Sequence, residues 1–143
     1  MDYFKLLHKI AGEAKLKYVQ ISRICEKNNV PFDENYISSY KNRSSIPTDN
    51  VSRAIARACG RHKELLVVQA YYDKSPEVFK NMFDTIIKIV KATILTLLWQ
   101  KATNEAIKEM QRKFDQMFFA EWLEYNLSDT AKQVGDAYDV FVK

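Results

Sequence analysis

The sequence predicts an all-α protein, and three observations predict it. Only 3 glycines and 3 prolines occur in 143 residues, fewer than a turn-rich β-sandwich or a glycine-rich nucleotide loop requires. Apolar residues make up 47% of the chain and charged residues 28%, proportions that are ordinary for a globular protein. Apolar side chains recur at three- and four-residue spacing along most of the chain, and no segment gives a convincing strand pattern.

The first half of the chain is expected to contain five short helices. The second should end at Asn28-Asn29-Val30-Pro31, because Asn tolerates left-handed geometry and Pro31 disfavours helical backbone at Val30. Thr48 is the expected N-cap of the fourth, and Gly60 suits the residue just after its end. The expected ranges are about Asp2–Ala14, Tyr18–Asn28, Asp33–Lys41, Thr48–Cys59 and Lys63–Tyr72.

The second half is expected to contain longer helices. A boundary lies near Asp73–Glu77, where Pro76 suits a first helical position. The sequence therefore predicts a domain at residues 1–73 and a helical region at residues 74–143. The expected helices are Pro76–Lys101, Thr103–Tyr125 and a last one from Ser128 or Asp129 to Val142.

Charge is unevenly spread between the two halves. Residues 1–63 carry 12 basic and 6 acidic side chains, a balance of +6. Residues 64–143 carry 10 basic and 12 acidic side chains, a balance of −2, which together give the net charge of +4. A basic first half indicates an N-terminal unit that binds a polyanion.

The segment from Val19 to Gly60 is the most informative part of the chain. A short helix, a turn, a second short helix, a loop with proline and an alanine-rich helix follow one another. This order resembles the helix-turn-helix domains of the Cro and phage-repressor (XRE-type) family over about residues 2–72. The resemblance is carried by Val19-Gln20, Ile24-Cys25, Val30, Tyr36-Ile37-Ser38-Ser39-Tyr40, Pro47-Thr48 and Ala54-Ile55-Ala56-Arg57-Ala58-Cys59-Gly60.

The resemblance implies a lambda-repressor-like DNA-binding domain followed by a C-terminal helical oligomerisation region. The third expected helix would then enter the major groove, where base edges present distinguishable donors and acceptors. Short polar side chains would read bases, and lysine, arginine and amide groups would contact phosphates. The candidate DNA-binding residues are Lys17, Gln20, Asn35, Tyr36, Ser38, Ser39, Lys41, Asn42 and Arg43.

Two charge patterns leave alternatives open. Arg53, Arg57 and Arg61 form one stripe at four-residue spacing, which is either a solvated helix face or a row of phosphate contacts. Asp33 and Glu34 begin the third expected helix, where Asp33 suits an N-cap and both carboxylates would repel phosphate.

The sequence offers little support for other classes of function. His8 and His62 stand alone, and no catalytic, metal or nucleotide motif occurs, so we expect neither an enzyme nor a cofactor or metal site. Cys25 and Cys59 lie in apolar-periodic segments and are expected to be buried, reduced thiols. The first residues lack a secretion-signal pattern, and the run Ala92–Trp99 is too short to span a membrane, so a cytoplasmic protein is expected.

The second half is expected to mediate self-association. A regulator that reads two half-sites needs a second copy, because one short helix contacts few base pairs. The long helix lacks a sustained heptad, which favours globular packing over a parallel zipper. The candidate interface residues are Phe79, Phe83, Ile87, Val90, Ile94, Leu98, Phe118 and Trp122.

Taken together, the residues predict a transcriptional regulator that binds a palindromic DNA operator as a homodimer or higher oligomer, similar to phage and mobile-element repressors. The alternative is a protein-interaction module on a helix-turn-helix scaffold. In that case the aromatic second half would bind an antirepressor, a toxin or another regulatory protein.

Overall fold

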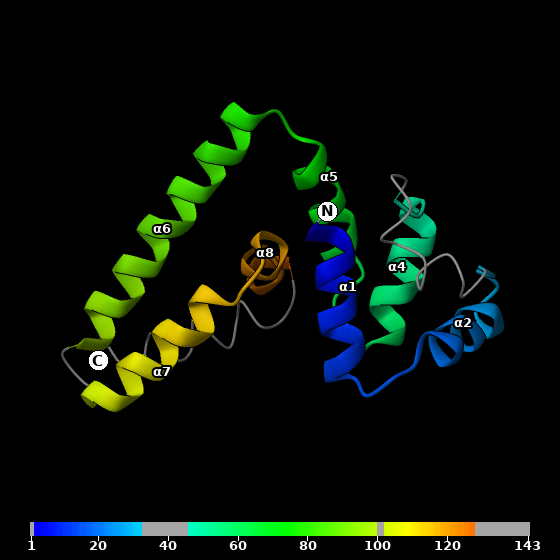
Figure 1. Ribbon diagram of the computed structural model, residues 1–143, viewed down its shortest axis with the longest axis horizontal. Coiled ribbons are helices and arrows are strands. Elements are labelled where there is room, and N and C mark those ends of the chain that lie inside the picture. The colour runs from blue at the N-terminus through cyan, green and yellow to red at the C-terminus, as the bar shows by residue number, and fades with distance from the viewer. Residues whose placement is uncertain (1, 33–45, 100–101, 128–143) are drawn as a thin grey trace. The chain divides into compact units, whose positions relative to one another are not determined.

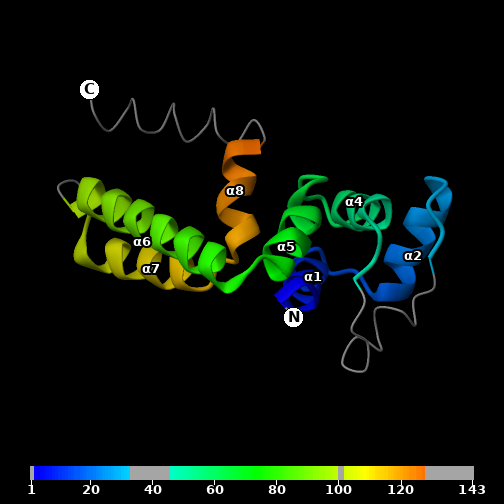
Figure 2. The same ribbon diagram turned by 90° about the horizontal axis from the view of Figure 1, so that it is seen from above.

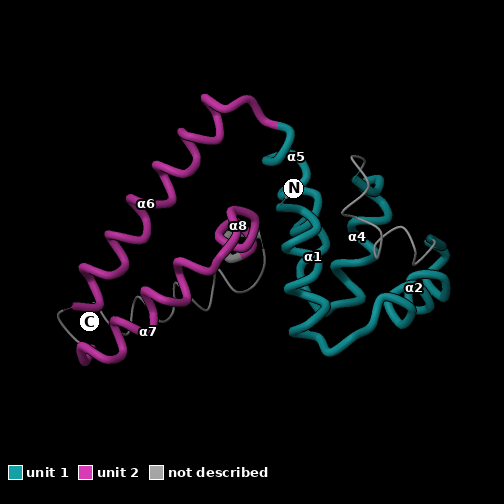
Figure 3. The backbone as a smooth tube through the Cα atoms, in the orientation of Figure 1, with its two compact units in different colours: residues 1–74 teal, residues 75–143 magenta. Residues whose placement is uncertain are grey.

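The computed structural model describes residues 2–32, 46–99 and 102–127 (Figure 1). These residues form seven α-helices, and no strand occurs among them, so the predicted all-α class is confirmed for this part of the chain. The chain divides into two compact units, residues 1–74 and 75–143 (Figure 3). This division falls one residue from the boundary drawn on the sequence.

The first unit contains four described helices, α1 (Asp2–Glu13), α2 (Tyr18–Lys27), α4 (Asp49–Ala58) and α5 (Leu65–Lys74). Helix α5 packs against α1 and α4, and α2 packs against α4 (Figure 2). Each of these helices contributes buried residues to one apolar core. The largest fully buried side chains of this core are Tyr3, Phe4, Leu6, Leu7, Ile10, Ile21, Cys25, Ile55, Leu65, Leu66 and Gln69.

Local chemistry ends the helices of this unit where the sequence predicts. Thr48 Oγ1 accepts the Val51 N–H at 3.5 Å as the N-cap of α4. Asn29 and Gly60 take left-handed backbone, with φ of 64° and 72°, just after α2 and α4. The next N–H then bonds back to the helix over 2.9 Å in both cases, which satisfies a terminal carbonyl.

One buried hydroxyl pair joins α1 to α4. The Tyr3 hydroxyl and Ser52 Oγ lie 2.8 Å apart in the core, and Ser52 Oγ also lies 3.4 Å from the Pro47 carbonyl oxygen. A buried hydroxyl without a partner is costly, so the pair restricts how α1 and α4 can be placed.

The second unit contains α6 (Glu77–Trp99), α7 (Asn104–Asp115) and α8 (Phe119–Leu127). Helices α7 and α8 both pack against α6. In Figure 1, α6 and α7 diverge from the connection that joins them, and Figure 2 shows α8 steeply inclined to both. None of the described helices combines the length and apolar character needed to cross a membrane. The expected last helix, from Ser128 or Asp129 to Val142, lies outside the described residues.

The prediction of one helix over Thr103–Tyr125 is wrong, because α7 ends at Asp115 and a separate helix, α8, begins at Phe119. The Glu121 carboxylate accepts the Phe118 N–H at 3.1 Å, which caps the start of α8. Glu121 is itself only 5% exposed. Apolar periodicity continues through the break, so the pattern gave no sign of it.

Candidate nucleic-acid interface

The start of α2 presents a cation and an amide to solvent. Lys17 is the N-cap residue, with extended backbone (φ −79°, ψ 156°), and its side chain is exposed. Gln20 Oε1 accepts the Lys17 N–H at 2.8 Å, so the amide is held against the helix end. A helix N-terminus carries a partial positive charge and unpaired N–H groups, which favour an anion such as phosphate.

Two further basic residues share the face of Gln20. Gln20, Arg23 and Lys27 are exposed, and their spacing of three and four residues aligns them along α2, away from buried Ile21 and Cys25. We call Gln20, Arg23 and Lys27 the α2 stripe. Sequence reasoning missed Arg23 and Lys27, although their spacing from Gln20 was a usable signal.

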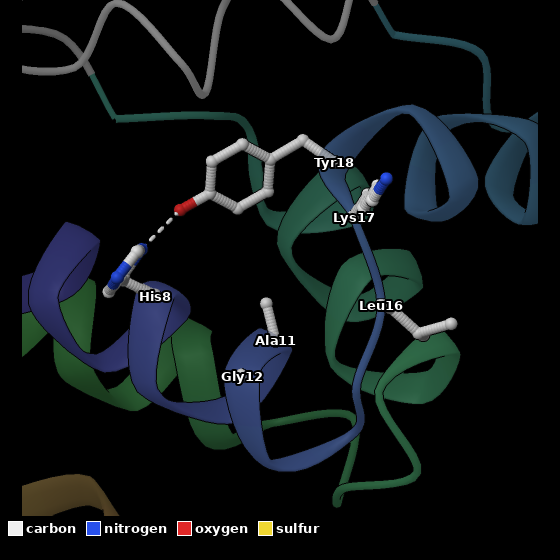
Figure 4. A pocket seen from close by; sticks show the side chains of 6 residues that line it. All are labelled: His8, Ala11, Gly12, Leu16, Lys17 and Tyr18. Atoms are coloured by element: carbon white, nitrogen blue, oxygen red, sulfur yellow. Dashed lines mark hydrogen bonds between the residues drawn. The ribbon is translucent and has the colours of Figure 1, made fainter.

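A short contact between side chains of α1 and α2 holds the junction between the two helices. His8 Nδ1 and the Tyr18 hydroxyl lie 2.7 Å apart across the joint (Figure 4). Lys15 takes left-handed backbone at φ 56°, and the Leu16 N–H bonds the Ala11 carbonyl at 3.1 Å. These contacts position the N-terminus of α2.

An open depression lies at this joint (Figure 4). Its volume is about 290 Å³. Apart from the His8, Tyr18 and Lys17 side chains its lining is apolar, so it offers few groups that would orient a polar ligand. The lining residues are His8, Ala11, Gly12, Leu16, Lys17 and Tyr18.

The far end of α2 is also held. Ile21 and Cys25 are fully buried, and Ser22 Oγ donates to the Phe32 carbonyl at 2.8 Å. The chain therefore leaves α2 at a defined point before residue 33 and returns at Ile46, ahead of α4. Seven of the nine predicted DNA-binding residues lie outside the described residues, namely Asn35, Tyr36, Ser38, Ser39, Lys41, Asn42 and Arg43.

The expected single stripe of three arginines is not formed, because α4 ends at Ala58 and Gly60 takes left-handed backbone, which places Arg61 beyond the helix that carries Arg53 and Arg57. Arg53 Nε donates to Glu64 at 2.9 Å, and this hydrogen bond raises the pKa of Arg53 above its usual value. Arg61 pairs with Glu13 over 3.2 Å, while Arg57 is exposed. These pairs favour a solvated, internally compensated face over a row of phosphate contacts.

The predicted interface residues of the second unit fall into three groups. Phe79 and Val90 on α6 are exposed. Trp122 is only 7% exposed, because its ring packs 5.0 Å from that of Phe114, with Lys91 Nζ 5.4 Å from the ring centroid. The third group is half-buried and consists of Phe83, Ile87, Ile94, Leu98 and Phe118.

Comparison with protein-family models, with curated proteins and with solved structures finds no match to this chain. Within the described ranges, no group of three His, Cys, Asp or Glu side chains is placed to hold a metal ion.

Proposed function

We propose that this protein is a cytoplasmic, sequence-specific DNA-binding transcriptional regulator of the phage-repressor type that acts as a homodimer. The observation that carries the proposal is the α2 stripe with Lys17, a row of exposed cationic and amide groups on a helix whose other side is buried. Such groups contact phosphates and set the register of a protein on DNA.

The placement of α2 in the chain supports the same function. In a helix-turn-helix, the first motif helix supports the second, which enters the major groove. Here α2 is anchored on α4 and leads directly into residues 33–45. That segment holds the short polar residues Asn35, Ser38 and Ser39 and the basic residues Lys41 and Arg43.

The regulatory mechanism would be steric. Two copies would place their recognition segments in successive major grooves of an inverted repeat, about 34 Å apart, and block or recruit polymerase. The balance of +6 over residues 1–63 would draw the first unit toward DNA, while the second unit, with its acidic balance, would supply self-association.

The test is selection of bound sequences from a random duplex pool at about 150 mM salt, where nonspecific phosphate binding is weak. Recovery of an inverted repeat with half-sites about one helical turn apart is the expected result. Recovery of no sequence above background would instead favour the protein-interaction module.

Substitutions separate phosphate contacts from base contacts. Lys17→Ala, Lys41→Ala or Arg43→Ala should weaken binding to all sequences and lower the salt slope by about one. Asn35→Ala or Ser39→Ala should change base preference at one position. Lys108→Ala removes an exposed charge from α7 of the second unit and is the matched control. If neither set changes binding, the assignment of the recognition segment is wrong.

A further inference from the structure

Helix α6 is apolar on two sides, and only one of them is covered within the second unit. No residue of α6 is buried. Phe83 on the inner side packs against Phe119 of α8, with ring centroids 5.2 Å apart. The other side exposes large apolar residues, each between 39% and 67% exposed, which we call the outer face of α6. They are Val78, Phe79, Met82, Ile86, Ile89, Val90 and Leu97.

The outer face is continuous and uncharged. At about 100° per residue, its seven members fall within an arc of about 120° that runs the length of the helix, roughly 30 Å. The acidic and basic residues of α6, such as Asp84 and Lys88, lie outside this arc. A helix with its apolar stripe open to water is unfavourable unless another surface covers it.

Threonine hydroxyls on this side of α6 are already satisfied. Thr93, inside the arc, donates to the Ile89 carbonyl at 2.9 Å. Thr96, at the edge of the arc, and Thr85, just beside it, donate to the carbonyls of Ala92 and Asn81 at 2.8 Å. Because each hydroxyl bonds the backbone four residues earlier, covering the face would leave none of them without a partner.

The exposed area is that of one side of a small dimer interface. The seven residues expose about half of their surface, on the order of 600 Å² per chain. A single monomer rarely exposes a larger apolar patch. Two such faces together would bury about 1,200 Å², the lower end of the range for specific interfaces.

We propose that the outer face of α6 binds the same face of a second copy of this chain, with the two helices antiparallel. The orientation follows from a gradient of side-chain size. Phe79 and Met82 make the first half of the face bulky, whereas Thr93 and Thr96 make the second half small. Antiparallel pairing sets Phe79 and Met82 against these two threonines, while parallel pairing would crowd the bulky end and leave gaps at the other.

The register follows from placing the two bulky residues, Phe79 and Met82, opposite the two threonines, Thr96 and Thr93. Ile86 lies opposite Ile89 of the partner subunit at the centre of the contact, and Met82 lies opposite the partner's Thr93. Phe79 then lies opposite the partner's Thr96. The two-fold axis passes between Ile86 and Ile89, so each contact occurs twice.

Sedimentation velocity of the full chain, without DNA and over a range of micromolar concentrations, tests the association. The wild type should be a dimer, and Ile86→Glu should raise the dissociation constant at least about 100-fold, because it buries unpaired charge. Lys88→Glu, on the same helix outside the outer face, should leave the constant unchanged. Ile86 is half exposed in the single chain, so a charge there should not prevent folding. An unchanged circular dichroism spectrum should show that the variant still folds.

Cysteine cross-linking tests the orientation. A mixture of Met82→Cys and Thr93→Cys chains should form a disulfide-linked heterodimer under mild oxidation, because the two positions face each other. Met82→Cys alone should not cross-link. The native thiols, Cys25 and Cys59, are buried and do not compete.

Three results would overturn the proposal. They are a monomeric wild type at every concentration, a dimer that tolerates Ile86→Glu, and self-linking of Met82→Cys, which indicates parallel helices. If residues 128–143 or a lipid surface cover the outer face instead, the wild type should be monomeric at every concentration. The inference rests on the proposed function for the role of the dimer, yet its test contains no DNA. A dimer that binds no DNA would therefore contradict only the proposed function, and a dimer that binds the operator but tolerates Ile86→Glu would contradict only this pairing.

Discussion

The carboxylate of Asp73 accepts a main-chain N–H from Tyr3 in the first turn of α1, 70 residues earlier in the chain. Its Oδ2 accepts the main-chain N–H of Tyr3 at 2.8 Å, and its Oδ1 accepts from the fully buried amide of Gln69 at 3.1 Å. Asp73 lies in the last turn of α5, where the helix dipole disfavours a negative charge. The same carboxylate lies at the first turn of α1, where N–H groups that receive no hydrogen bond from within the helix and the positive helix end favour it.

Removing this cap should destabilise the first unit. Asp73→Ala leaves the Tyr3 N–H and the Gln69 amide without that acceptor, so unfolding free energy should fall by about 1–2 kcal/mol. Glu26→Ala, which removes an exposed carboxylate from α2, should change it by less than about 0.5 kcal/mol. Urea unfolding followed by circular dichroism compares the two variants. Equal losses of unfolding free energy in the two variants would show that Asp73 stabilises the unit only through its charge and not as a cap.

Two glycines should respond to alanine in opposite directions. Gly60 has φ of 72°, so Gly60→Ala should cost about 1 kcal/mol, although no atom lies within 4 Å of the added carbon. Gly12 lies inside α1 with equally open space, and Gly12→Ala should add up to about 1 kcal/mol. Thermal unfolding of both variants measures the difference. A loss of stability in Gly12→Ala would contradict the helical backbone assigned to Gly12.

Both thiols should resist alkylation in the folded protein. Burial raises the pKa of Cys25 and of Cys59 from 9.0 to about 11. At pH 8, iodoacetamide should therefore react about 100-fold more slowly than with the urea-unfolded chain, because the thiolate is the nucleophile. Equal rates in the two states would contradict burial of the thiols.

Because of these two raised thiol pKa values, the stability of the fold should depend on pH in the alkaline range. Burial favours the neutral thiol, so the folded pKa lies above the unfolded one. The stabilising contribution is complete below about pH 9 and is lost as pH rises through about 11. Unfolding free energy measured from pH 8 to pH 11 should fall, and Cys25→Ala should reduce the fall. An unchanged pH dependence in that variant would count against the explanation.

Arg53 and Arg61 should differ from Arg23 in their effect on DNA affinity. Arg53 and Arg61 are engaged with Glu64 and Glu13, so Arg53→Ala and Arg61→Ala should change affinity for the selected operator by less than about two-fold. Arg23→Ala, on the α2 stripe, should weaken binding and lower the salt slope by about one. Fluorescence anisotropy over a series of salt concentrations measures both. A loss for Arg53→Ala as large as that for Arg23→Ala would revive the row of phosphate contacts on α4.

Capping of α8 by Glu121 can be tested with a conservative pair of variants. Glu121→Gln keeps an oxygen that accepts the Phe118 N–H, whereas Glu121→Ala removes it. The alanine variant should lose about 1 kcal/mol more than the glutamine variant. Tryptophan fluorescence reports unfolding here because Trp122 is buried in α8. Identical unfolding curves would mean that another contact breaks the helix after Asp115.

The sequence by itself determined the features that depend on neighbouring residues. The all-α class, the Thr48 cap and the helix ends at Asn29 and Gly60 follow from periodicity, short polar caps and tolerance of left-handed backbone. Burial of Cys25 and Cys59 followed from their apolar surroundings. In the candidate site, the sequence alone indicates Lys17 and Gln20, and the structure places both in exposed positions at the start of α2.

Tertiary structure alone decided the features that join distant residues. Asp73 capping α1, Arg53 with Glu64 and Arg61 with Glu13 connect positions between 11 and 70 residues apart, which no local pattern encodes. The break between α7 and α8 was hidden because apolar spacing continues through it. The long helix shows one broad apolar pattern in sequence, and only the packing of α7 and α8 shows which side of α6 is covered. The physical reason is that periodicity records which residues avoid water, whereas the partner that removes the water is set by the fold.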